Sequence, residues 1–167
     1  MSELKYRTAT EADLKQLQQL GVISYGQFQS ILGDENWEIM KANKNNDDTY
    51  LSLLKIATCF VCEDKNKIIG MAFLIPSGNP TTIFETGWSY IRLVGVHPNY
   101  EGKGIGKKLT QQCIDTAKIS GEKVIALHTS EFQNAARHIY ENLGFVKLKD
   151  LDLIFGKQYY LYTLQLK

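Results

Sequence analysis

The sequence predicts an α/β or α+β fold, in which a β-sheet is covered by helices. Three observations predict it: apolar strands alternate with amphipathic helices, a glycine-rich turn joins one strand directly to a helix, and no internal repeat or linker interrupts this order. At 167 residues and 44% hydrophobic content, the chain has the size and composition of one soluble domain. We therefore expect a single domain over residues 1–167.

The first third of the chain predicts one strand followed by helices. Residues 4–8 alternate polar and apolar side chains, as a strand does, and residues 10–13 are typical of a capped helix start, followed by leucines at helical spacing. One or two further helices are expected between residues 21 and 55, separated by the polar segment 43–48.

The remaining two thirds predict strands that alternate with two helices. Strands at 58–63 and 67–75 flank an Asp-Lys-Asn sequence that suits a hairpin turn. Apolar residues at helical spacing predict helices over about 105–120 and 132–143, each followed by a glycine that ends it. The other strands are expected at 89–96, 124–127, 145–148 and 159–166.

Charge and hydropathy exclude several classes of partner. Lys and Arg number 19 against 18 Asp and Glu, so a net charge of +1 provides no overall field to attract nucleic acid or an anionic membrane. No apolar stretch approaches the roughly 20 residues that span a bilayer. The N-terminus lacks the apolar block of a secretory signal. We expect a cytoplasmic protein with no nucleic-acid and no membrane partner.

The cysteines favour buried thiols over a metal site. Cys59 and Cys62 form a C-x-x-C on a predicted strand, where positions three apart point to opposite faces and cannot jointly hold a metal. A second C-x-x-C is missing, and three cysteines without a secretory signal do not indicate a disulfide framework. No metal is expected.

The most informative segment is the glycine-rich turn 100–108 between an expected strand and an expected helix. Its glycines allow a tight turn and close approach of a ligand, while the N–H groups of the helix start face outward. The helix macrodipole adds about half a positive charge there, which favours a phosphate. Lysines are unfavourable at a helix start unless an anion lies close, and this start carries Lys103, Lys107 and Lys108.

Two common phosphate-binding loops do not fit this segment. A P-loop requires G-x-x-x-x-G-K-S/T, which matches neither the glycine spacing nor the residue after the lysine. A dinucleotide fingerprint requires G-x-G-x-x-G, and the third glycine comes one residue early, at Gly106. A solvated surface turn is the remaining alternative.

The segment from Val96 to Gly106 resembles the central motif of the GNAT superfamily of acetyl-CoA-dependent N-acetyltransferases. In that family a strand is followed by Q/R-x-x-G-x-G/A and a helix; Glu101 stands here where Arg or Gln is usual. A second family motif, N-x-x-A-x-x-x-Y followed by G-F, is comparable with the stretch that carries Asn134 and Tyr140 and then Gly-Phe. There Arg137 replaces the alanine.

The resemblance implies a mixed sheet of six or seven strands that splays open at its middle and binds acetyl-CoA, the co-substrate, in the slot. Backbone groups of Val94 and Val96 would pair with the pantetheine arm, and one N–H would polarise the thioester carbonyl. Gly95 between them is consistent with a bulge or a close backbone approach. The further implied cofactor contacts are Glu101, Gly102, Lys103, Gly104, Ile105, Gly106, Lys107, Asn134 and Arg137. For Asn134 the alternative is a helix N-cap.

Candidate catalytic residues follow from the same resemblance. Tyr140 resembles the general acid that returns a proton to the CoA thiolate, the alternative being a core tyrosine. Where the family frequently has a Glu that acts as the general base on the strand, this chain has Tyr90. The candidate general bases are therefore Glu85 and Glu131, and the alternative for each is a solvated surface acid. His128 is a further candidate base.

The expected function is therefore transfer of an acetyl group from acetyl-CoA to a primary amine, by direct attack. The absence of any basic or acidic stripe favours a small-molecule amine over a protein amine. A binding protein that keeps acyl-CoA but has lost turnover, such as a sensor or a subunit, is the alternative. The acceptor and the oligomeric state, a homodimer included, are left open by the sequence.

Overall fold

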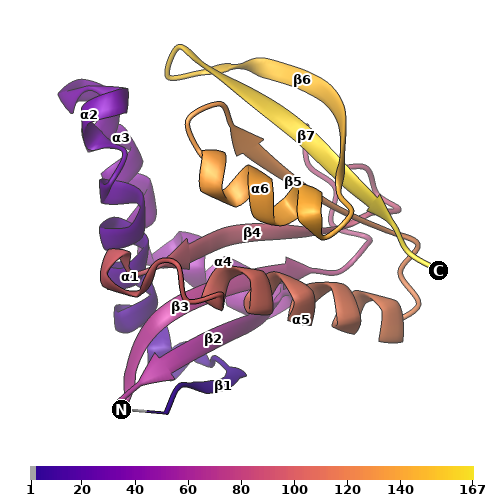
Figure 1. The fold of residues 1–167 in the computed structure, drawn as a ribbon, viewed down its shortest axis with the longest axis horizontal. Helices are drawn as coiled ribbons and strands as arrows, with labels where there is room; N and C mark the ends of the chain where they lie inside the picture. The colour runs from indigo at the N-terminus through magenta and orange to yellow at the C-terminus, as the bar shows by residue number, and fades with distance from the viewer. Residues whose placement is uncertain (1–2) are drawn as a thin grey trace.

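The computed structural model describes residues 3–167, and the expected mixed fold is confirmed: a seven-stranded sheet lies between two layers of helices (Figure 1). The sheet has the order β1-β2-β3-β4-β5-β7-β6. Its strands are β1 Lys5–Thr8, β2 Thr58–Asp64, β3 Lys67–Ile75, β4 Ser89–Val96, β5 Val124–Ser130, β6 Val146–Ile154 and β7 Lys157–Gln165. The helices are α1 Leu14–Gly26, α2 Gln29–Leu32, α3 Asp34–Lys44, α4 Asp47–Ile56, α5 Ile105–Ile119 and α6 Asn134–Asn142, with 3₁₀ turns η1 Glu11–Asp13 and η2 Pro98–Tyr100.

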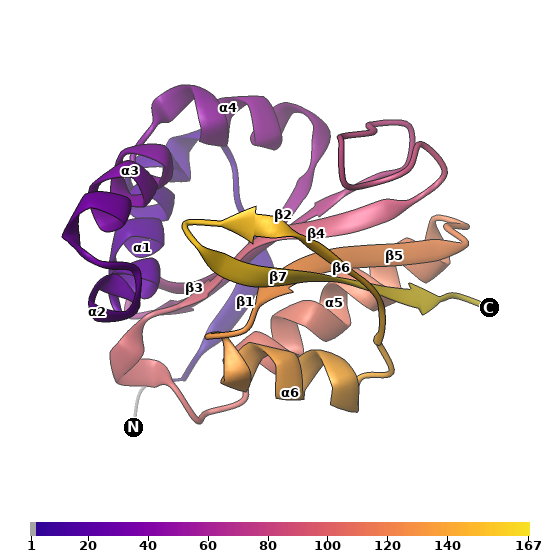
Figure 2. The same ribbon diagram turned by 90° about the horizontal axis from the view of Figure 1, so that it is seen from above.

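Each face of the sheet has its own core. Helices α1 to α4 lie on one side of the sheet and α5 and α6 on the other (Figure 2). Cys59 is buried in the core under α1 and α4, whereas Cys62 is buried in the core under α5 and α6. The two thiols therefore point to opposite faces of β2, as their spacing predicts.

The helical segment after α1 differs from the expectation of one or two helices. Helix α1 continues through Gly21 to Gly26, and glycine at position 21 allows the Tyr50 hydroxyl of α4 to approach closely. Gly33, at φ +86°, separates α2 from α3. The expected polar loop over 43–48 shrinks to two residues, because the Asn46 side chain accepts from the Thr49 N–H at 3.2 Å and caps α4.

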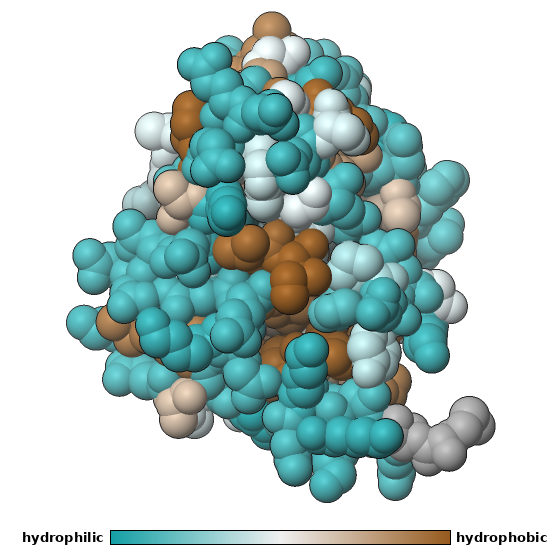
Figure 3. Space-filling model, turned by 90° about the vertical axis from the view of Figure 1, so that its left-hand side faces the viewer, coloured by the Kyte–Doolittle hydropathy of each residue, from teal (hydrophilic) through white to brown (hydrophobic). Residues whose placement is uncertain are grey.

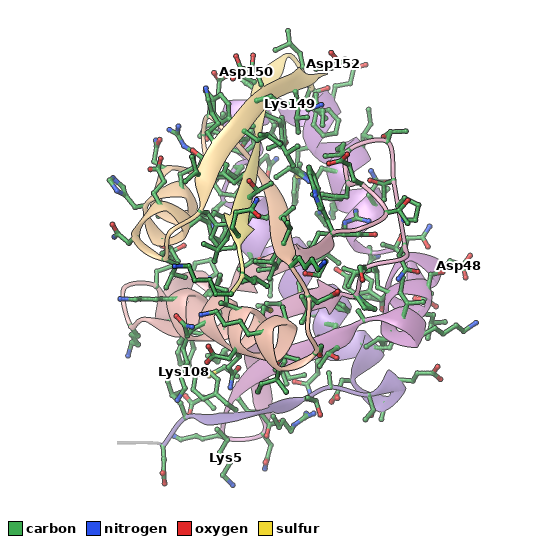
Figure 4. All side chains as sticks on the ribbon, turned by 90° about the vertical axis from the view of Figure 1, so that its right-hand side faces the viewer. Lys5, Asp48, Lys108, Lys149, Asp150 and Asp152 are labelled. Atoms are coloured by element: carbon green, nitrogen blue, oxygen red, sulfur yellow. The ribbon has the colours of Figure 1, made fainter. Side chains whose placement is uncertain are left out.

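Strand β6 is longer than the predicted 145–148. Two register shifts against β7 interrupt its alternation, and all but one of its residues are exposed, so no apolar period marks it in the sequence. Figure 4 shows its charged residues Lys149, Asp150 and Asp152 at the edge of the molecule.

The sheet opens between β4 and β5, as expected. These parallel strands share only two register pairs, Ser89 with Ile125 and Tyr90 with Ala126. Beyond these two pairs the carboxyl ends of β4 and β5 point apart (Figure 1). The second half of β4 therefore keeps β3 as a partner and leaves its other edge free of strand pairing.

A bulge distorts the free half of β4. Gly95 lies opposite Met71 and Arg92 opposite Phe73, so that β3 supplies a single residue against two of β4. Leu93, one of the two, has φ +53°, an uncommon value for a residue with a side chain. Glycine at position 95 allows β4 to pack closely against α1, because a Cβ there would lie 2.6 Å from Ser24 Oγ.

We expect Gly95→Ala to destabilise the protein by about 1–3 kcal/mol, because the added methyl overpacks the contact between β4 and α1. Thermal unfolding followed by circular dichroism measures the effect. Gly87→Ala is the matched control, since nothing lies within 4 Å of a Cβ at that position. If the contact with Ser24 causes the destabilisation, adding Ser24→Gly to Gly95→Ala should restore part of the lost stability. Equal melting temperatures for Gly95→Ala and Gly87→Ala would contradict the prediction.

Candidate functional site

The glycine-rich loop after β4 presents unpaired backbone donors. Gly102 and Gly104 both have φ +77°, in the left-handed region that favours glycine, and Gly104 is the N-cap of α5. Within residues 3–167, no oxygen accepts a hydrogen bond from the N–H groups of residues 102–107. Unpaired N–H groups at a helix start suit an anion.

The lysines of this loop differ in what they contact. Lys108 Nζ lies 4.0 Å from the Tyr6 ring centroid, on the side of α5 that faces β1 (Figure 4). Lys103 Nζ lies 5.7 Å from the Tyr100 ring centroid. Lys107 is exposed. No carboxylate in the described part of the chain pairs with any of the three, so their charges are available to an anion.

The free edge of β4 holds the two residues expected to meet the pantetheine arm. Val94 and Val96 are half-buried, and both pack against the core under α5 and α6. The Val94 carbonyl accepts a hydrogen bond from the Tyr25 hydroxyl at 3.4 Å. This contact places Tyr25, from α1, at the opening between β4 and β5.

Helix α6 contributes Asn134 and Arg137. The N-cap position is Gln133, so the N-cap alternative for Asn134 is wrong. The Gln133 side chain makes no capping hydrogen bond, and its Oε1 instead accepts from the Ser130 N–H at 3.0 Å. Asn134 is exposed in the first turn, where its Oδ1 accepts from Arg137. Arg137 Nε is buried without a hydrogen-bond partner in the described chain.

Tyr140 lies on the apolar face of α6. It is 6% exposed, its ring packs against Phe145, and its hydroxyl has no hydrogen-bond partner among residues 3–167. Buried phenols usually find such a partner, so this hydroxyl is free for a ligand. Burial raises the pKa of Tyr140, with smaller contributions from Tyr25 and Cys113. Tyr140 belongs to the same core under α5 and α6 against which Val94 and Val96 of the free β4 edge pack.

The two candidate carboxylates occupy opposite ends of the opening. Glu85 is exposed in the loop before β4, at the end where β4 and β5 still pair, and it lines a surface pocket of about 700 Å³ with Leu148 and Lys149. Glu131 is exposed directly after β5, at the splayed end, and its N–H donates to the Gln158 carbonyl at 2.9 Å. Only Glu131 is brought to the splayed end.

An aromatic cluster, which the sequence did not predict, crosses the splayed end on the α1–α4 face. Five rings follow one another at centroid distances of 6.5, 5.0, 6.1 and 5.9 Å: Tyr25, Phe28, Phe132, Tyr159 and His128. Figure 3, which looks onto this side of the molecule, shows a hydrophobic hollow surrounded by hydrophilic side chains.

Two cations beside the aromatic cluster were also missed. Lys44 Nζ lies 4.3 Å from the Tyr25 ring centroid, and Arg92 projects from β4 two residues after Tyr90. Burial, and then the charge of Arg92, lowers the pKa of Lys44 to about 8. A cation within the otherwise apolar strand 89–96 was the one signal in the sequence that could have marked this place.

A model of the acetyltransferase (GNAT) family matches residues 28–145, more than half of the chain. The chain belongs to this family. Among relatives of this GNAT protein, N-alpha-acetyltransferase 30 of Schizosaccharomyces pombe is 34% identical over 92 residues, which cover 55% of this chain and 59% of that protein. L-amino acid N-acyltransferase MnaT of Escherichia coli is 40% identical over 53 residues, covering 32% of this chain and 31% of that one. The matches thus span from about a third to three fifths of these relatives' length.

Solved structures share the whole GNAT fold at low identity. The PaiA N-acetyltransferase of Thermoplasma acidophilum, in complex with coenzyme A, has a TM-score of 0.78 and 16% identity, with 98% of this chain and 99% of that chain covered. An N-acetyltransferase of Staphylococcus aureus Mu50 has a TM-score of 0.77 and 18% identity, with 99% and 100% covered. These similarities establish the fold of the present GNAT chain.

Within residues 3–167, no group of three or more His, Cys, Asp or Glu side chains is arranged to hold a metal ion. None of the helices in that range combines the length and the apolar character needed to cross a bilayer.

Proposed function

We propose that this chain is an N-acetyltransferase that transfers an acetyl group from acetyl-CoA to a primary amine of a small molecule. One observation carries the proposal: β4 and β5 part after two register pairs, and β4 leads into a loop whose amides at 102–107 have no hydrogen-bond partner in residues 3–167. A strand edge with free backbone groups suits an amide-containing arm, and unpaired N–H groups at a helix start suit a diphosphate. Acetyl-CoA carries both.

The cofactor contacts in this proposal are backbone groups supported by a few side chains. Val94 and Val96 pair with the pantetheine arm, and an N–H of the bulged strand polarises the thioester carbonyl, which stabilises the oxyanion by a few kcal/mol. The diphosphate rests on the loop from Glu101 to Lys107, with Lys103 and Lys107 nearby. Asn134 and Arg137 contact the arm from α6.

The chemistry is a direct attack within a ternary complex. The neutral amine attacks the thioester carbonyl, a C–N bond forms, and the C–S bond then breaks to leave acetylated amine and CoA thiolate. Tyr140 donates its proton to the sulfur. Burial in the apolar site disfavours both the Tyr140 phenolate and the CoA thiolate. Proton transfer from the hydroxyl to the sulfur therefore exchanges one disfavoured anion for another in the same site.

The amine must lose a proton before or during attack, and we assign its removal to Glu131, acting through water. Glu131 lies at the splayed end of β5, whereas Glu85 lies at the paired end of β4. His128 is a poor acceptor, because burial, together with Arg92 and Lys44, lowers its pKa to about 4.

The acceptor is taken as a small-molecule amine because the chain has no charged stripe to bind a macromolecule. The names of the relatives include both a protein N-terminal acetyltransferase and an amino-acid acyltransferase, so peptides belong in the assay panel.

A panel of primary amines and peptides tests the proposal. We expect calorimetry to detect acetyl-CoA binding with competition by free CoA, and a thiol reagent to detect CoA release with at least one amine. An acyl-CoA sensor, the competing function, would bind acetyl-CoA and release no thiol with any acceptor. Absence of binding heat would contradict both functions.

A further inference from the structure

Three nitrogen-bearing side chains converge on the α1–α4 face of the sheet opening. Lys44 comes from the end of α3, Arg92 from β4 and His128 from β5. Arg92 shares its face with Tyr90, which is buried in the core under α1 and α4. The His128 ring lies 5.9 Å from Phe84 of that same core.

These groups have no negative partner in residues 3–167. The ion pairs there involve Arg7 and Lys147, and no hydrogen bond satisfies Lys44 or Arg92. His128 Nδ1 is buried without a hydrogen-bond partner in the described part of the chain. The groups act on one another instead, since Arg92 lowers the pKa of Lys44 and both cations lower the pKa of His128.

Partly buried like charges without a counter-charge oppose folding, unless a ligand supplies the missing charge. The phosphates of CoA do not fit that role, because the loop 101–107 leads into α5 on the other face of the sheet. The thioester end of CoA is uncharged. The remaining molecule in the reaction is the acceptor.

We propose that the acceptor is an amine that also carries a carboxylate, bound by Arg92 and Lys44 with a further hydrogen bond from His128. The proposal rests on the acetyl-transfer function above and specifies its substrate class. A planar guanidinium binds a carboxylate through two parallel hydrogen bonds, and the rings of Tyr25 and Tyr159 reduce the water around it. The carboxylate comes either from a free amino acid or from an acidic side chain of a peptide.

The first test uses the unaltered chain. CoA release is measured with the twenty amino acids as free acids, with their amides, with the decarboxylated amines, and with amidated dipeptides whose second residue is Glu. We expect at least a tenfold higher kcat/KM, per concentration of neutral amine, for carboxylate-bearing acceptors. Preference for the free acids assigns the α-carboxylate, and preference for the Glu dipeptides assigns the side chain. Equal or faster turnover of amides and decarboxylated amines overturns the proposal and leaves the acetyl-transfer function intact.

The second test uses variants that remove the charges. Arg92→Met and Lys44→Met are expected to raise KM for the carboxylate-bearing acceptor about tenfold, with kcat within about threefold and acetyl-CoA affinity unchanged. Unchanged acetyl-CoA affinity also shows that the variants fold. Lys41→Met is the control, because Lys41 is exposed on the same helix. An unchanged KM in both variants overturns the proposal.

A third measurement separates the two proposals if no amine is turned over. Calorimetry of N-acetylated amino acids against the CoA-loaded chain reports the carboxylate site without catalysis. If the chain binds N-acetylated amino acids and Arg92→Met weakens this binding about tenfold, the carboxylate site is supported in a protein that lacks transfer activity. Absence of such binding overturns the site together with the activity.

Discussion

Replacement of Tyr140 by phenylalanine is expected to lower kcat for acetyl transfer by about 10²- to 10³-fold, which is the usual contribution of a positioned general acid. Tyr140 carries its proton at neutral pH, as any tyrosine does, and burial raises its pKa further, so the hydroxyl can act only as a donor to the sulfur. Acetyl-CoA affinity should change little, because the hydroxyl acts on the departing sulfur and not on the bound thioester. Steady-state thiol release and calorimetry measure the two effects.

The thermal stability of the Tyr140→Phe variant provides a check on this prediction. Because the Tyr140 hydroxyl has no hydrogen-bond partner in residues 3–167, its removal should not lower the melting temperature. Tyr162→Phe is the matched control: Tyr162 is buried in the same core, but its hydroxyl already donates to Glu141 Oε2 at 3.3 Å. We expect its kcat to stay within about threefold. An unchanged kcat in Tyr140→Phe would leave Tyr140 as a core residue only.

The features that the sequence predicted well depend on local backbone chemistry. The hairpin turn is one, since Lys65 and Asn66 adopt φ of +51° and +67° between β2 and β3. The loop after β4 is another, because Gly102 and Gly104 allow left-handed conformations at fixed sequence positions. Neither feature requires knowledge of distant parts of the chain.

The features that the sequence did not predict depend on tertiary contacts. Tyr25, Lys44 and Arg92 come from three different elements, and only the packing of α1 and α3 against the opened strands brings them together. The N-cap alternative for Asn134 failed because α6 begins at Asn134 itself, and the N-cap position falls on Gln133, whose side chain makes no capping hydrogen bond. Spacing along the chain carries no signal for such convergence.

Replacement of Gly104 by valine is expected to weaken acetyl-CoA binding about 100-fold. A β-branched residue at φ +77° is a severe outlier, and an L-residue in this region costs about 1–2 kcal/mol. The loop is expected to relieve that strain by turning its peptide planes, which redirects the N–H groups of residues 102–107 away from a shared anion. Each misdirected donor to a diphosphate removes a charge-assisted hydrogen bond. Calorimetry with acetyl-CoA measures the loss.

The variant Gly121→Val is a control that separates the loss of acetyl-CoA binding from the backbone strain that a valine causes at positive φ. Gly121 has φ +81° just beyond the other end of α5, and nothing in residues 3–167 lies within 4 Å of a Cβ there. Its valine variant therefore carries comparable strain about 25 Å from Gly104 along the helix. Both variants should lower the melting temperature to a similar extent, but only Gly104→Val should lose acetyl-CoA affinity. Gly104→Asn should retain more affinity than Gly104→Val, because asparagine tolerates the left-handed region. Equal acetyl-CoA affinity in the two valine variants would mean that the backbone of this loop does not hold the diphosphate.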